Sequence, residues 1–151
     1  IGLLNMIFNI KQFKELSTHE LYAILQLRAE IFVVELDCVY LDLDNKDKDA
    51  YHVLGVLDNK IVAYARIFKP GDYFLESSIG RIVVKKEFRK HQYGYKLVAN
   101  SIQFIEKKLQ ENNILISAQS YLSKFYNSLG FIKIGEEYLE DGIPHIKMLR
   151  N

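Results

Sequence analysis

One stretch near the middle of the chain, residues 79–96, sets the strongest limit on its fold. Its sequence, IGRIVVKKEFRKHQYGYK, is a β-branched run followed by a basic segment, Gly94 and an apolar segment with helical spacing. Strand, basic loop, glycine and helix suit anion binding, because the first N–H groups of a helix lack internal partners and carry the positive end of the helix dipole. The same order also suits an ordinary basic strand–helix connection, so the residues alone leave both interpretations open.

Length and composition limit the other possibilities. With 151 residues, 49% of them hydrophobic, the chain is long enough for one core and too short for two, so we expect one domain over residues 1–151. The net charge of +1 provides no overall field for nucleic acid, and a single cysteine, Cys38, excludes an internal disulfide. No apolar run approaches the roughly 20 residues of a membrane span.

These features predict a cytoplasmic protein without a nucleic-acid or membrane partner, present as a monomer or a homodimer. Ile1–Asn5 precede Met6 and lack the charged start of a signal peptide, so we expect them to be a cloning remnant.

Hydrophobic patterning predicts the element order β-α-β-β-β-α-β-α-β-β. A first strand begins at Ile7, and Ser17 and Glu20 form a capping box that opens a helix extending to about Val34. The later expected elements are strands at Val53–Leu57, Ile61–Phe68 and Ser78–Val84, a helix of about five turns ending at Asn112, a strand at Ile114–Ser117, a helix at Leu122–Leu129, and strands at Phe131–Ile134 and His145–Leu149. This order predicts an α/β fold with a central mixed sheet flanked by helices.

Two ionisable residues, Arg28 and Glu35, lie on the apolar stripe of the first expected helix. Such groups are costly on a buried face unless they are paired or exposed in a cleft, so an ion pair and a site role are both open. The next segment, residues 36–50, is rich in aspartate. An EF-hand calcium loop fails there, because Asp47 and Val53 occupy the positions that need glycine and glutamate. A solvated acidic loop is the favoured interpretation, and an acidic lip that attracts an amine is the second.

Two motifs resemble those of the GNAT superfamily of N-acetyltransferases. Residues 89–94, RKHQYG, are similar to the pyrophosphate loop of that family, although Gln92 replaces its first glycine. Residues 125–131, FYNSLGF, are similar to its second signature. The segments Arg28–Asp44 and Glu140–Met148 resemble the ElaA-like branch, so the resemblance covers nearly the whole chain.

The resemblance implies a GNAT acyl-CoA N-acyltransferase fold and transfer of an acetyl group from acetyl-coenzyme A (acetyl-CoA) to a primary amine. The acceptor would be a small molecule or a peptide, attacking directly in a ternary complex without a metal. The cofactor-binding residues that it implies are Ile82, Val83, Val84, Arg89, Lys90, His91, Gln92, Tyr93, Gly94, Tyr95, Gln119 and Phe125. Gln92 should be tolerated if its φ angle is helical.

Tyr126 aligns with the tyrosine that protonates the departing thiolate in many relatives. A buried structural tyrosine is the alternative. The general base is open between two residues. Glu35 is the first choice, since burial would raise the pKa of its carboxyl towards neutrality, and His145 is the second, since imidazole titrates in the useful range. The arginines that could instead pair with Glu35 are Arg28, Arg66 and Arg81. The other histidines, expected at the surface or in loops, are His19, His52 and His91.

Two other functions stay open on the residues. A cysteine hydrolase would use Cys38, but no cysteine signature surrounds it. A non-catalytic acyl-CoA sensor or interaction module would keep the same loop and Tyr126. Turnover with amines, as opposed to binding alone, distinguishes this module from the enzyme.

Overall fold

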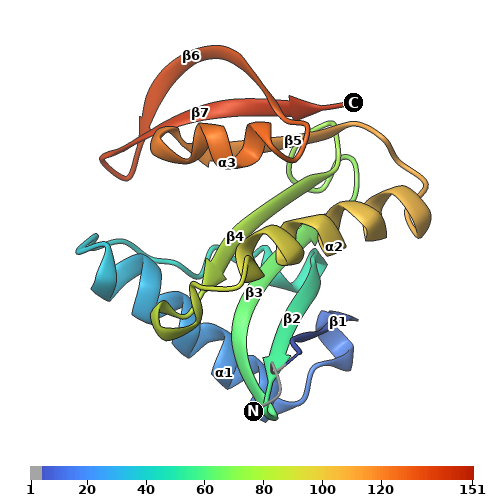
Figure 1. Ribbon diagram of the computed structural model, residues 1–151, viewed down its shortest axis with the longest axis vertical. Helices are drawn as coiled ribbons and strands as arrows, with labels where there is room; N and C mark the ends of the chain where they lie inside the picture. The colour runs from blue at the N-terminus through green and yellow to red at the C-terminus, as the bar shows by residue number, and fades with distance from the viewer. Residues whose placement is uncertain (1–4) are drawn as a thin grey trace.

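The strands form two antiparallel sheets, seen in the computed structural model of Figure 1. The structure describes residues 5–151, so Ile1–Leu4, most of the expected cloning remnant, lie outside the described residues. The first sheet has the order β1 (Ile7–Gln12), β2 (Tyr51–Leu57), β3 (Lys60–Phe68) and β4 (Ser78–Val84), and the second has the order β5 (Ile114–Gln119), β7 (Ile143–Arg150) and β6 (Ile132–Glu140). In the described part of the chain, one parallel bridge between Ser77 and Ile114 joins them. The predicted fold class is confirmed. The parallel pairing expected in a mixed sheet is this bridge at the start of β4 and β5.

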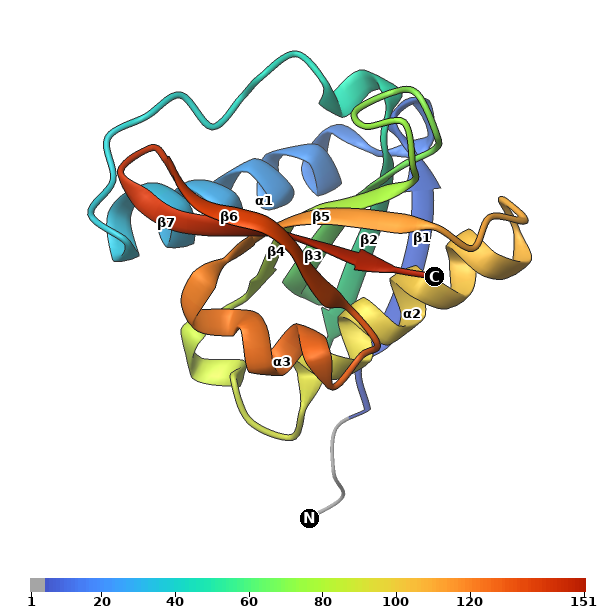
Figure 2. The same cartoon turned by 90° about the horizontal axis from the view of Figure 1, so that it is seen from above.

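Helices cover both faces of the sheets. Figure 2 shows α1 (Thr18–Arg28) on one side and α2 (Tyr93–Lys107) with α3 (Ser123–Asn127) on the other. Ser17 Oγ accepts from the Glu20 N–H at 3.0 Å, and Glu20 Oε1 accepts from the Ser17 N–H at 2.9 Å, so the predicted capping box is confirmed. Among residues 5–151, no helix has the length and apolarity to cross a membrane.

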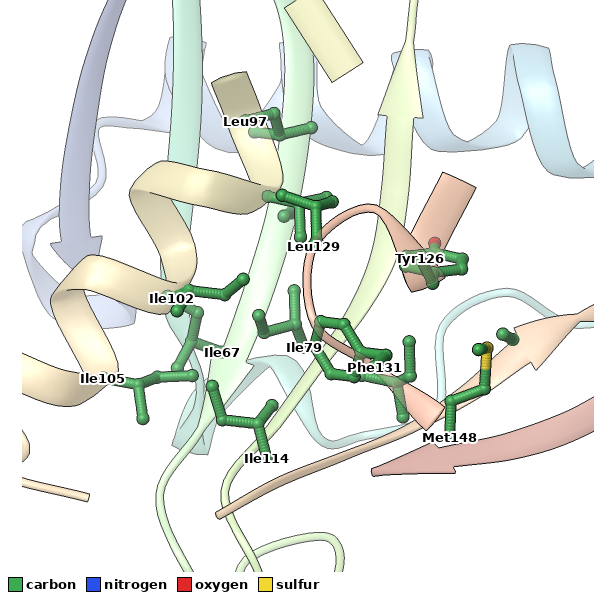
Figure 3. Close-up of a cluster of buried hydrophobic side chains, with 14 of the residues drawn as sticks. Ile67, Ile79, Leu97, Ile102, Ile105, Ile114, Tyr126, Leu129, Phe131 and Met148 are labelled. Atoms are coloured by element: carbon green, nitrogen blue, oxygen red, sulfur yellow. The ribbon is translucent and has the colours of Figure 1, made fainter. Parts of the chain in front are cut away.

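The main hydrophobic core lies between α2 and the sheets. In Figure 3, Leu97, Ile102 and Ile105 of α2 lie over Ile67 of β3 and Ile79 of β4. A smaller cluster holds α1 to the first sheet and consists of Ile24, Leu27, Ile31, Leu54, Tyr64 and Val83. Each buried large aliphatic side chain contributes about 1.5–3 kcal/mol relative to an exposed one, so these contacts fix both helices against the sheets.

The first helix does not remain an α-helix to Val34, as predicted. After Arg28 it continues as a π-helix, η2 (Ala29–Glu35), in which the Leu36 N–H donates to Ile31 O at 3.1 Å. A π-helix has more residues per turn than an α-helix, so Glu35 leaves the stripe that holds Arg28. The two side chains therefore face different parts of the molecule.

The prediction of a solvated acidic loop is wrong for three of its five aspartates. These three carboxylates belong to a buried ion network of Arg28, Arg66, Arg81, Asp42, Asp44 and Asp47, whereas Asp37 and Asp49 are exposed to solvent. Arg28 lies 2.8 Å from Asp42 and 2.7 Å from Asp47, and its side chain is fully buried. Of the two roles that the sequence left open for Arg28, an ion pair and a site role, the structure shows the ion pair. Because the arginines compensate the aspartates, this network does not form a free acidic lip.

The surface position expected for His52 is also wrong. It lies on β2 with 0% exposure. Its Nε2–H donates to Asp47 O at 2.8 Å, which leaves Nδ1 to accept from the Tyr64 hydroxyl at 2.6 Å. Burial lowers the pKa of His52.

Two elements differ in length from the prediction. Helix α2 ends at Lys107, before the expected Asn112, because Gln110 has a φ of 57° and cannot continue a helix. Strand β6 extends beyond Ile134 to Glu140, because a bulge that includes Gly135, with a φ of 71°, replaces the expected break.

Candidate active site

A cavity of about 1200 Å³ opens where β4 and β5 separate beyond the Ser77–Ile114 bridge. It brings together all the predicted site residues: Glu35, Ile82, Val83, Val84, Arg89, Lys90, His91, Gln92, Tyr93, Gly94, Tyr95, Gln119, Phe125, Tyr126 and His145. A large cleft between structural units with a few polar groups is typical of a ligand site.

The residues that line the cavity come from two groups of elements, which define its two sides. The α2 side contains the loop at residues 89–92, the first turn of α2 and Phe125 of α3. The α1 side contains the loop after η2 and the β6–β7 turn, where the Cys38 thiol donates to Asp141 O over 3.4 Å. We define the α1 side by Cys38, Tyr40, Glu140, Asp141, Ile143 and His145.

Strand β4 forms one wall and contains a bulge that the sequence did not predict. Between the Tyr64–Val83 and Arg66–Gly80 pairs, two residues of β4 oppose one residue of β3. The first of the two, Arg81, has a φ of 50°, an uncommon angle for a residue with a Cβ. A bulge removes backbone groups from the ladder, so those beside Arg81 are available to a ligand.

The buried ion network supports this strained position. Arg81 Nε lies 2.8 Å from Asp42 Oδ1, and its Nη2 donates to Asp42 O at 2.9 Å. Arg28 contacts the other oxygen of the same carboxylate. The loop after η2 therefore holds the bulge of β4 from the α1 side.

The basic loop leads into α2 through two residues in the left-handed region. His91 has a φ of 61° and Gln92 a φ of 58°. The condition under which Gln92 would be tolerated without cost, a helical φ, is therefore not met. This conformation costs about 1–2 kcal/mol for a residue with a Cβ and little for glycine, which explains the glycine in the family motif.

The N-terminus of α2 faces the cavity. Gln92 is its N-cap residue and makes no side-chain capping bond, so the first N–H groups of the helix are not used by that side chain. A Cβ on Gly94 would lie 3.8 Å from Phe125 and 3.9 Å from Val84, which are ordinary van der Waals distances, so the packing would accept a Cβ and the glycine leaves that space in the cavity wall unfilled.

Glu35 pairs with Arg89, which was not among the arginines expected to contact it. Its carboxylate lies 2.7 Å from Arg89 Nη1 and 2.9 Å from Nη2. The hydrogen bond from Arg89 lowers the pKa of Glu35, whose side chain is 31% exposed. The expected rise in this pKa is therefore wrong, although Glu35 lines the cavity, and its role as a base stays a prediction.

Tyr126 lies between the core and the cavity. Its ring makes edge contacts with Phe125 and Phe131, at centroid distances of 5.1 and 6.0 Å, and Figure 3 shows it at the margin of the core cluster. Burial raises the pKa of its hydroxyl, which therefore keeps its proton at neutral pH. This state suits a proton donor, and the donor role stays a prediction.

The second sheet supplies a polar cluster on the α1 side. His145 Nδ1 lies 2.7 Å from Ile143 O, and its Nε2 lies 3.2 Å from Glu140 Oε2. Ser117 donates to Glu140 Oε1 at 3.3 Å and also bonds to the hydroxyl of Tyr138, whose ring stacks on His145.

Three members of this cluster were missed from the sequence: Ser117, Tyr138 and Glu140. The last two lie beyond Ile134, where the strand was expected to end. Their i, i+2 spacing, which places them on one face of a strand, was the available signal.

Comparison with known proteins agrees with this architecture. Residues 27–150 match the family model of the acetyltransferase (GNAT) domain. The Escherichia coli (strain K12) protein ElaA is 42% identical over 138 residues, which are 90% of each chain. The crystal structure of Escherichia coli ElaA has a TM-score of 0.90 at 38% identity and covers 97% of this chain and 100% of that chain.

A second solved structure is an acyl-CoA N-acyltransferase from Pseudomonas aeruginosa. It has a TM-score of 0.92 at 36% identity and covers 97% of this chain and 100% of its own. The family match spans β4, the basic loop, α3 and the β6–β7 hairpin, which together form the cavity. The chain is therefore an acyltransferase and belongs to the GNAT acetyltransferase family.

Proposed function

We propose that this protein transfers an acetyl group from acetyl-CoA to a primary amine of a small molecule or peptide. One observation carries the proposal: a single cavity joins the bulged strand β4 to a basic loop and the N-terminus of the 15-residue helix α2. The strand suits an extended amide-containing arm, and the helix terminus suits phosphate.

The residues of the α2 side fit coenzyme A. Arg89 and Lys90 would supply positive charge to its pyrophosphate, and the first N–H groups of α2 would donate to the same oxygens. The backbone beside Arg81 would pair with the pantetheine arm, and Gly94 leaves the wall clear. When bound, acetyl-CoA supplies an acyl group activated as a thioester.

The chain supplies the remaining requirements of amide formation. An amine must lose a proton, the acyl oxygen needs a hydrogen-bond donor, and the leaving sulfur needs an acid. Backbone N–H groups at the β4 bulge suit the acyl oxygen, and the protonated Tyr126 hydroxyl suits the sulfur.

Calorimetry tests the binding site. We expect coenzyme A to bind more tightly than dephosphorylated pantetheine, because the loop holds the phosphates. Lys90→Ala should weaken coenzyme A binding several-fold, whereas Lys108→Ala, an equal change in charge at the exposed far end of α2, should not. Equal affinities for coenzyme A and pantetheine would refute the phosphate site.

Turnover tests the reaction. Release of free thiol from acetyl-CoA should depend on an added primary amine, and the acetylated amine should appear in equal amount by mass spectrometry. Tight coenzyme A binding without amine-dependent thiol release would instead identify a sensor.

A further inference from the structure

Glu140 lines the same cavity as the bulged part of β4. Counting three residues from the Ser77–Ile114 bridge along the two parallel strands brings Gly80 level with Ser117. Ser117 donates to Glu140 and the bulge begins directly after Gly80, so the carboxylate lines the cavity near the backbone assigned to the acyl group.

The hydrogen-bond geometry of Glu140 and His145 leaves a place for one proton between them. The carbonyl of Ile143 can only accept, so His145 Nδ1 carries a hydrogen and donates it over 2.7 Å. In the neutral ring, Nε2 then presents a lone pair towards a carboxylate oxygen of Glu140 at 3.2 Å. One proton placed between these two atoms satisfies both.

The other contacts of the carboxylate do not supply that proton. Ser117 donates its hydroxyl hydrogen to Oε1, and Tyr138 then donates to the Ser117 oxygen. Among residues 5–151, no lysine or arginine forms an ion pair with Glu140. This distinguishes Glu140 from Glu35, whose two oxygens both contact Arg89.

We propose that the Glu140–His145 pair accepts the proton that the ammonium group of the acceptor loses before it attacks. This inference rests on the proposed N-acetyltransferase function. One proton passes from R–NH3+ to the pair, the nitrogen forms a bond to the acyl carbon, and the carbon–sulfur bond breaks. The nitrogen loses a second proton when the amide forms, and this proton compensates for the one that converts the leaving thiolate to a thiol. Glu140, which is half-exposed, returns the first proton to water.

The charges around the pair select the class of acceptor. Arg66 on β3 and Arg81 on β4 line the cavity, and aspartates of the buried network bind both of them. In the part of the chain that the structure describes, no lysine or arginine without a carboxylate partner lines the α1 side. A carboxylate next to the acceptor amine would find no cation among the residues that line the α1 side and would repel Glu140. Lys46, whose Nζ lies 5.6 Å from the centroid of the Tyr73 ring, is not one of the lining residues.

Aromatic and apolar groups line much of the α1 side and the cavity wall next to it. The side chains concerned are Phe32, Leu36, Tyr40, Phe68, Tyr73 and Ile143. We therefore assign the acceptor as a cationic primary amine on an apolar or aromatic body without an α-carboxylate. The titratable groups around the pair are Tyr138 on β6, Asp141 in the turn, Tyr40 in the loop after η2 and Tyr73 in the loop before β4.

Matched acceptors test the class. Phenethylamine and phenylalanine differ only in the carboxylate, as do 1,5-diaminopentane and lysine. We expect kcat/KM for each amine to exceed that of its amino acid by at least about tenfold. Equal values, or a preference for the amino acids, would overturn the assignment of the acceptor class.

Glu140→Gln tests the pair, with Glu137→Gln on the exposed part of β6 as the control of equal charge. At neutral pH we expect Glu140→Gln to lower kcat/KM for phenethylamine by about 10²–10⁴-fold, the usual size of a general-base contribution. Its coenzyme A affinity and Tm should match the wild type, and Glu137→Gln should retain full activity.

An amine that is already uncharged at neutral pH separates proton transfer from a structural effect. With 2,2,2-trifluoroethylamine the ratio of wild-type to Glu140→Gln rates should fall towards one, because no proton has to be removed before attack. If this ratio stayed as large as with phenethylamine, or if Glu140→Gln lost no activity with phenethylamine, the pair would not be the proton acceptor. A wild-type enzyme that releases no thiol with any amine would refute the proposed function itself, which is a different result from either.

Discussion

Glu35 and Arg89 form a two-point ion pair that joins the end of η2 to the basic loop before α2, with N–O distances of 2.7 and 2.9 Å. The Nε of Arg89 also donates to Val84 O at 2.9 Å, at the end of β4. The guanidinium expected to hold pyrophosphate is therefore already neutralised by a carboxylate that lines the same cavity.

Glu35→Gln should tighten coenzyme A binding by about two- to fivefold, because it removes an anion near the phosphates. That range corresponds to about 0.4–1 kcal/mol, within the range for an exposed pair. Since Arg89 lowers the pKa of Glu35, the rise of kcat/KM with pH should keep its shape. Calorimetry and a pH–rate profile measure the two effects, and a profile that loses its rise would restore Glu35 as the base.

Tyr126→Phe should lower turnover by about 10–10³-fold and leave coenzyme A affinity nearly unchanged, because it removes a proton donor and keeps the packed ring. Tyr22→Phe, on the exposed surface of α1, is the matched control. Turnover equal to the wild type would assign Tyr126 to the core alone.

Substitutions of Gln92 should change stability as expected for a residue in the left-handed region of φ. Gln92→Gly should keep or raise the free energy of unfolding, by up to about 1 kcal/mol, whereas Gln92→Val should lower it by about 1–2 kcal/mol. Urea unfolding of both variants provides the measurement. A stable Gln92→Val protein would show that the loop adopts another conformation.

Arg28→Met should lower the free energy of unfolding by about 3–5 kcal/mol, because it leaves the carboxylates of Asp42 and Asp47 buried with less compensation. The comparison is Lys11→Met, which breaks the partly exposed pair with Glu20 at 2.8 Å and should cost about 1 kcal/mol or less. Similar losses in the two variants would contradict a buried network.

His52 should make the protein less stable below about pH 6.5. Burial lowers its pKa in the folded state, so below the unfolded value of about 6.5 the unfolded chain binds more protons. The free energy of unfolding should then fall by up to about 1.4 kcal/mol per pH unit. His52→Gln should flatten this slope between pH 6.5 and 5, while His19→Gln, at the exposed start of α1, should leave it unchanged.

The sequence by itself determined the local elements and the family. Ser17 and Glu20 satisfy the N-terminus of α1 with bonds three residues apart, and Gly130 has the positive φ of 92° expected after a helix. Short-range chemistry decides such features. Motifs near Arg89 and Tyr126 were sufficient for the fold class for the same reason, since each is a continuous segment.

Only the tertiary structure decided the partners of the charged residues. Which carboxylate reaches Arg28, Arg81 or Arg89 depends on the π-turn in η2 and on how the aspartate loop crosses the sheet, which no local pattern specifies. The contact between Ser117 and Glu140 joins residues 23 positions apart through strand pairing. Side-chain pairing across a chain depends on the relative positions of packed elements, and those positions follow from the burial of the whole core rather than from any one segment.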